Sequence, residues 1–191
     1  MDVQRLAGLV IIVGFVVFWT GNVYSPSGVY GETAVAARLE VVAQNPLRWA
    51  LSQGMGGLGY IMILLGFILW SISLLGRINP GLIAIPAVIH LIAATLVAIY
   101  LYQYITDPAA VWENVHPSLF QQFVPALVWA AALLYGLLFL QAGLPAWLSY
   151  LMIGFGAIAV AAQFLFQPPA FYVISLYSLI ALAAGIVLVR Q

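Results

Sequence analysis

Long apolar segments alternate with short polar ones along most of this chain. Six of these segments reach the roughly 20 mainly apolar residues that a helix needs to cross the hydrocarbon layer of a bilayer. Turn-forming residues, such as Asn79-Pro80-Gly81, separate neighbouring segments. The pattern predicts an all-α integral membrane protein, a single domain over residues 1–191 that forms a bundle of about six transmembrane helices. We expect the spans at about residues 6–24, 46–75, 82–104, 118–141, 145–166 and 169–189.

The connection over residues 25–45 has a pattern of its own. Val35, Leu39 and Val42 recur at helical spacing, and Arg38 and Glu40 lie off that apolar stripe. A narrow apolar stripe on a polar helix is typical of a helix that rests on a membrane surface or on a bundle. We therefore expect a short amphipathic helix between the first and second spans.

The second span begins at Asn45-Pro46. An asparagine followed by a proline is a common helix start, because the asparagine side chain caps free backbone N–H groups and the proline needs no hydrogen bond. We expect Asn45 to be the N-cap of that helix.

Composition agrees with a bilayer as the surrounding medium. The chain is 65% hydrophobic and 5% charged, whereas soluble domains carry about 25% charged residues. The absence of lysine and a formal net charge of zero argue against nucleic-acid binding and against a polybasic segment for anionic lipid. The absence of cysteine excludes disulfides, thiolate metal sites and a cysteine nucleophile. The first apolar segment has no evident cleavage site, so we interpret it as an uncleaved span.

Arginine distribution gives an expected orientation. Six spans place both termini on one side, together with Arg5, Arg77 and Arg190, and leave Arg38 and Arg48 on the other side with four of the five acids. Because arginine and lysine are enriched in cytoplasmic connections, the sequence predicts a multi-pass protein of the cell membrane with both termini in the cytoplasm.

Aromatic residues gather near the expected ends of the spans. Trp49 and Tyr102 lie near one boundary, and Trp70, Trp147 and Tyr150 lie near the other. Tryptophan and tyrosine favour the membrane–water interface, because their rings are apolar and carry one polar group. We expect these side chains to be interface anchors.

His90 is the one ionisable residue deep within a span. Burying such a group without a partner is costly, so an intramembrane histidine is a candidate for function. Pro86 lies four residues earlier and removes a backbone donor, and Ala87 leaves space beside the imidazole. We expect these three residues to form the candidate ligand or buried polar site.

Three interpretations of His90 remain open from the sequence. It can be a neutral histidine hydrogen-bonded to another helix, and the candidate partners are Ser71, Tyr135, Gln163 and Ser175. It can contact a tetrapyrrole cofactor, although the chain has no second histidine at matching depth for bis-histidine ligation. It can also relay protons. We expect no cofactor under the first interpretation and a tetrapyrrole under the second.

Two further groups of residues stand out. Gly54, Gly56, Gly57 and Gly59 make the second span rich in glycine, which predicts close helix packing or an irregular backbone. Asp107, Glu113 and His116 lie in the connection over residues 105–117, where Asp107-Pro108 resembles another helix start. This acidic and histidine group is a weak metal-site candidate, because metal sites in helical bundles draw further acids from other helices.

Three functions are compatible with these features. The leading hypothesis is a non-enzymatic accessory subunit or a binder of a small apolar ligand, because the spans contain almost no reactive side chains. The alternatives are a redox or pigment-associated subunit, in which His90 contacts a tetrapyrrole, and a small carrier or channel for a neutral solute. The expected partners are membrane lipid, other membrane subunits or further copies of the chain, and not nucleic acid.

Overall fold

The computed structural model describes residues 2–112, 119–166 and 170–191. In those residues it contains helices and connections but no strand. Six of its helices are long and apolar enough to cross a membrane, which confirms the predicted all-α membrane bundle. The eight helices of these described ranges are α1 Val3–Val23, α2 Val35–Gln44, α3 Pro46–Ser73, α4 Pro80–Thr106, α5 Pro108–Trp112, α6 Leu119–Gln141, α7 Ala146–Leu165 and α8 Ala170–Arg190.

The short helix α2 confirms the amphipathic element expected between the first two spans. Val42 is its one buried residue and joins Val29 and Trp49 in a small cluster apart from the main core. Tyr104 and Trp112 pack against this cluster. The stripe that marked α2 in the sequence therefore attaches the helix to the end of the bundle.

The start of α3 differs from the expected cap. Pro46 occupies the first turn as predicted, but the Asn45 side chain makes no capping hydrogen bond. Its Nδ2 instead donates to the carbonyl oxygen of Val41 at 3.1 Å. The reason is local: α2 ends at residue 44, and Asn45 satisfies one of that helix's free C-terminal carbonyls. Asn79 does cap α4, where its Oδ1 accepts from the backbone N–H of Gly81 at 2.9 Å.

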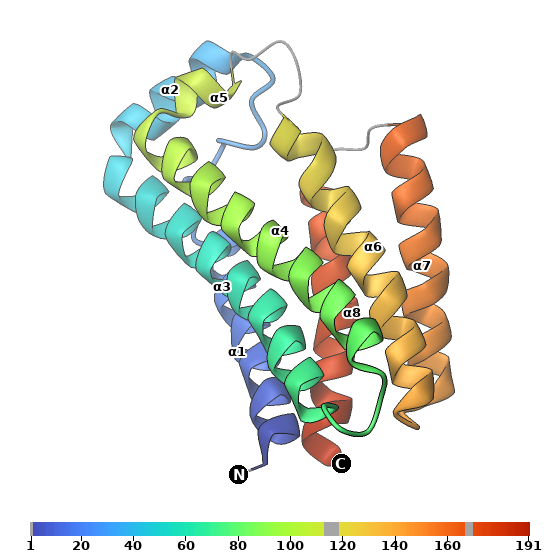
Figure 1. Cartoon of the computed structure of the whole chain (residues 1–191). Coiled ribbons are helices and arrows are strands. Elements are labelled where there is room, and N and C mark those ends of the chain that lie inside the picture. The colour runs from blue at the N-terminus through green and yellow to red at the C-terminus, as the bar shows by residue number, and fades with distance from the viewer. Residues whose placement is uncertain (1, 113–118, 167–169) are drawn as a thin grey trace.

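Each span packs mainly against one or two other spans (Figure 1). α1 packs most extensively on α3 and also on α8, α3 packs on α4, α4 on α6 and α6 on α7. Both described ends of the chain lie at one end of the bundle with the α3–α4 and α6–α7 turns, and α2 and α5 lie at the other end. The turns between the long helices and the two short helices therefore lie at opposite ends of the bundle.

Close approach between α1 and α3 depends on glycine. A Cβ atom at Gly14 would lie 2.7 Å from the carbonyl oxygen of Gly59, and one at Gly59 would overlap the backbone of Phe18. Lipid tails are as apolar as leucine, so tight van der Waals packing of this kind, rather than apolar burial, holds helices together in a membrane. The glycines that meet across this interface are thus structural.

The core is rich in large aromatic side chains. Trp49 and Trp70, which the sequence places among the interface anchors, are instead 1% and 0% exposed inside the bundle. Tyr102, Trp147 and Tyr150 are exposed by 70%, 57% and 64%. The difference arises because position along a span does not specify which face of the helix a residue occupies.

Candidate functional site around His90

His90 lies on α4 with no exposed surface. Its Nε2 is 3.2 Å from the hydroxyl oxygen of Tyr177 on α8. The direction of this hydrogen bond follows the imidazole tautomer, because a neutral ring donates from one nitrogen and accepts at the other. Pro86 is buried in the same helix, which remains helical through it, and Ala87 is partly buried. The imidazole thus has a polar partner on a helix 87 positions away in sequence.

Aromatic rings enclose the imidazole. The ring centroid of Tyr135 lies 4.9 Å from that of His90, and the centroids of Phe67 and Tyr177 lie 5.6 and 6.0 Å from it. Phe67 and Tyr177 meet the imidazole in T-shaped geometry, which aromatic rings favour, and Tyr135 is tilted against it. Side chains from α3, α6 and α8 therefore surround His90.

Tyr177 is the centre of a larger ring cluster. Besides His90, its ring contacts those of Tyr60 and Trp129, at centroid distances of 6.2 and 5.6 Å. Phe67 lies 6.1 Å away. All of these side chains have at most 2% exposure. One tyrosine thus links α3, α4 and α6 to α8 at the middle of the bundle.

Some buried polar atoms of this cluster lack a hydrogen-bond partner within the described residues. They are Nδ1 of His90, the hydroxyl of Tyr60 and Nε1 of Trp129. The backbone of Leu64 and that of Val128 lie close enough to the imidazole for weak hydrogen bonding to its ring. Leaving such atoms unpaired costs about 1–3 kcal/mol each, so a small polar molecule that reached this cluster would find hydrogen-bonding groups there.

The partner of His90 is not among the four that the sequence suggested. Tyr135 contacts the imidazole with its ring, but its hydroxyl shares a hydrogen bond of 3.1 Å with Ser71. Gln163 is buried on α7. Tyr177 was missed because the sequence does not reveal which helices are neighbours. The one sequence feature that could have identified Tyr177 is its place in the middle of the last span, because tyrosines usually gather at the membrane interface.

The four glycines of α3 do not form one site. Within a continuous α-helix, Gly59 faces α1, while a Cβ at Gly57 would overlap the side chain of Leu101. Gly54 has no neighbouring atom within 4 Å of its hypothetical Cβ, and Gly56 has only Asn22 at 4.0 Å. The backbone there is regular, so close packing, rather than an irregular segment, accounts for the part of the cluster that meets another helix.

The weak metal-site candidate of Asp107, Glu113 and His116 lies only partly within the described residues. The Oδ1 of Asp107 accepts a hydrogen bond of 3.1 Å from the backbone N–H of Ala110, which caps α5. Glu113 and His116 lie outside the described residues. Among the residues that are described, no three acids, histidines or cysteines lie together as a metal site would require. Asp107 therefore has a structural contact of its own.

Comparison of the chain with protein-family models, with curated proteins and with solved structures finds no match in any of the three. Function is therefore inferred from the residues and their geometry.

Proposed function

We propose that this protein is a non-catalytic accessory subunit of the cell membrane, which acts through contacts with lipid and with other membrane proteins. The observation that supports this proposal is the enclosure of His90. Its Nε2 is engaged by Tyr177 and its ring is surrounded by Phe67, Tyr135 and Tyr177. The deepest ionisable group of the spans thus serves the packing of the bundle, and the lipid-facing surface and the two polar ends are left for interactions.

The proposed orientation has both termini in the cytoplasm. The end that carries them holds Arg5, Arg77 and Arg190, and the opposite end holds Arg38 and Arg48. A larger number of arginines in short connections favours the cytoplasmic side. In this orientation α2 and α5 face the exterior of the cell.

A carrier for a small neutral solute is the second candidate. The unpartnered polar atoms of His90, Tyr60 and Trp129 all surround Tyr177. A polar solute or water that reached them would satisfy hydrogen bonds that the closed bundle leaves open. This candidate requires an additional conformation in which water reaches the cluster.

The tetrapyrrole alternative has less support from the geometry. A metal at the centre of such a cofactor needs an imidazole nitrogen with open space in front of it. The hydroxyl of Tyr177 occupies that position at Nε2, and aromatic rings pack around the imidazole. For the accessory subunit we expect no visible absorption band that changes on the substitution His90→Ala. A band that His90→Ala abolishes would favour the pigment-associated alternative.

Cysteine accessibility distinguishes the accessory subunit from the carrier. The chain has no cysteine, so a single introduced thiol can be followed without background. Ala94 lies one helical turn from His90 and is 6% exposed, and Ala34 lies in the exposed connection before α2. We expect a water-soluble thiosulfonate reagent to modify Ala34→Cys but not Ala94→Cys in lipid nanodiscs.

Two controls make the accessibility experiment decisive. Unfolding in dodecyl sulfate exposes both thiols, so Ala94→Cys must then react as Ala34→Cys does. Equal unfolding temperatures for the two variants show that the introduced sulfur has not opened the bundle. Modification of folded Ala94→Cys at a rate close to that of Ala34→Cys would contradict the closed accessory subunit and support the carrier.

A further inference from the structure

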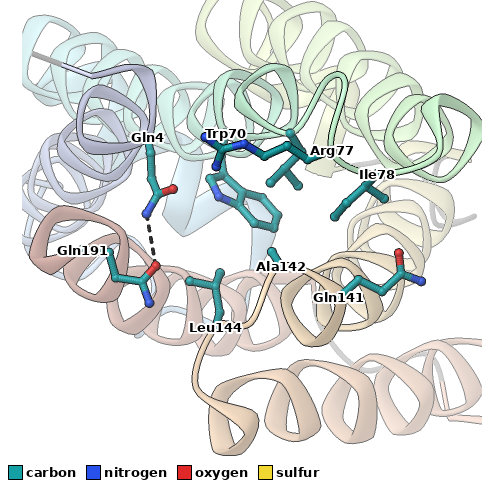
Figure 2. A pocket seen from close by; sticks show the side chains of 9 residues that line it. Gln4, Trp70, Arg77, Ile78, Gln141, Ala142, Leu144 and Gln191 are labelled. Carbon is teal, nitrogen blue, oxygen red and sulfur yellow. Dashed lines mark hydrogen bonds between the residues drawn. The ribbon is translucent and has the colours of Figure 1, made fainter.

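A pocket of about 160 Å³ opens at the end of the bundle that carries the termini. Four separate segments line it: the start of α1, the end of α3 with the turn that follows, the α6–α7 turn and the residue after α8 (Figure 2). This volume corresponds to about five water molecules, at ~30 Å³ for each. It suits a small polar group rather than a large cofactor. The residues that give it its chemistry are Gln4, Trp70, Arg77, Gln141, Leu144 and Gln191.

The α3–α4 turn places a positive charge at this pocket. Gly76 has a φ of 82°, a left-handed conformation that glycine adopts without strain, and Arg77 follows it directly. The backbone N–H of Arg77 donates to the carbonyl oxygen of Leu74 at 3.0 Å, which fixes the turn. In Figure 2 the Arg77 side chain extends from this turn toward Trp70 and Gln4. Its guanidinium therefore belongs to the pocket.

The charge of Arg77 has no partner among the residues that the structure places. At the opposite end of the bundle, Arg38 and Arg48 each donate to a backbone carbonyl oxygen, at 2.6 and 2.9 Å. The guanidinium of Arg77 makes no such hydrogen bond and no ion pair within the described ranges. Asp2, the acid of this end, instead accepts a hydrogen bond from the backbone N–H of Gln4. An anion would supply the contact that Arg77 lacks.

Amide groups and apolar side chains complete the pocket. Nε2 of Gln4 donates to Oε1 of Gln191 at 3.2 Å, which joins the start of α1 to the residue after α8 and leaves the Gln191 amide nitrogen as a donor (Figure 2). Gln141, the last residue of α6, also lines the pocket, and in Figure 2 its amide extends away from Trp70 and Arg77. Trp70 and Leu144 are buried and form an apolar floor. The pocket therefore combines one cation and several N–H donors with an apolar surface.

We propose that this pocket binds a phosphate group, with Arg77 as its charged partner. The planar guanidinium donates parallel hydrogen bonds that match phosphate oxygens, and the amides supply neutral donors beside it. The pocket lies where the membrane spans end, at the level of lipid headgroups, so the phosphate of an anionic glycerophospholipid reaches it directly. The buried side chains of Trp70 and Leu144 close the inner side of the pocket. This inference is independent of the role of His90.

Lipid binding to single-arginine variants tests the proposal. Native mass spectrometry of the detergent-solubilised protein is titrated with phosphatidylglycerol, with phosphatidylcholine and, in a separate arm, with inorganic phosphate. We expect Arg77→Gln to weaken the binding of the first phosphatidylglycerol by about tenfold, the range that loss of a charged hydrogen bond produces. Arg190→Gln is the matched control, because Arg190 lies exposed at the same end but outside the pocket. It should change binding by less than about twofold, as exposed charges do.

Comparing the lipid titrations with the titration of inorganic phosphate also identifies the source of the phosphate. Phosphatidylglycerol binding that depends on Arg77 but not on Arg190 supports the proposal with a lipid as the source. Inorganic phosphate binding with that same dependence, but without such a lipid effect, supports it with a free phosphate as the source. Equal losses for Arg77→Gln and Arg190→Gln, or no loss for either, would overturn it.

Discussion

The hydrogen bond between His90 and Tyr177 decides how the one deep ionisable residue of this protein is interpreted. A histidine at that depth is a functional candidate because its burial without a partner is costly. Here the partner is a neutral phenol on another helix, so the imidazole can remain neutral and link α4 to α8 through side chains. The residue that attracts attention in the sequence is then one half of an interhelical contact.

Removing only the hydroxyl of Tyr177 tests this contact. We expect Tyr177→Phe to lower the free energy of unfolding by about 1 kcal/mol, because interhelical hydrogen bonds in membranes contribute roughly 0.6–2 kcal/mol. The measurement is reversible unfolding in mixed micelles with increasing dodecyl sulfate. Tyr102→Phe is the matched control, since Tyr102 is 70% exposed, and it should leave stability unchanged. Equal stabilities for the two variants would show that the pair contributes nothing.

A double-mutant cycle with His90→Phe separates the pair from its surroundings. His90→Phe leaves the Tyr177 hydroxyl without its partner, whereas the double variant removes both polar groups together. We expect the two substitutions to be non-additive by about 0.5–1.5 kcal/mol, the double variant being more stable than the sum predicts. Strict additivity would contradict a direct hydrogen bond.

At the scale of helices, the sequence identifies the elements better than their contacts. Apolar length alone predicts the six spans, and the stripe of Val35, Leu39 and Val42 predicts α2. Sequence periodicity is weak for α4, because lipid and protein interior are both apolar and the two faces of a span look alike. The neighbours of each span, and with them the partner of His90, therefore appear only in three dimensions.

The glycines of α3 also show that the sequence does not reveal which residues contact another helix, and they provide a paired test. Gly59 meets the α1 backbone, whereas Gly54 has open space around its hypothetical Cβ. We expect Gly59→Ala to destabilise the bundle by about 1–3 kcal/mol through overpacking. Gly54→Ala should be neutral or stabilising by up to about 1 kcal/mol, because alanine favours helix more than glycine does. Unfolding in mixed micelles compares the two, and equal effects would contradict the α1–α3 packing.

At the scale of the whole molecule, the two ends of the bundle differ in construction. One end is covered by α2 and α5 over the cluster of Val29, Val42 and Trp49. The other end carries the pocket with Arg77. No continuous sequence pattern predicts this pocket, because four segments contribute to it and the chain has no polybasic run. A single arginine in a turn gains significance only from the side chains that the fold places beside it.

Labelling from one side of the membrane tests the six-span bundle most directly. Single cysteines are introduced at Ala34, in the connection before α2, and at Gln191, after α8. Intact cells are then treated with a membrane-impermeant maleimide, before and after permeabilisation. We expect Ala34→Cys to be labelled in intact cells and Gln191→Cys only after permeabilisation, because five spans separate the two positions. Labelling of both cysteines from the same side would contradict the bundle described here.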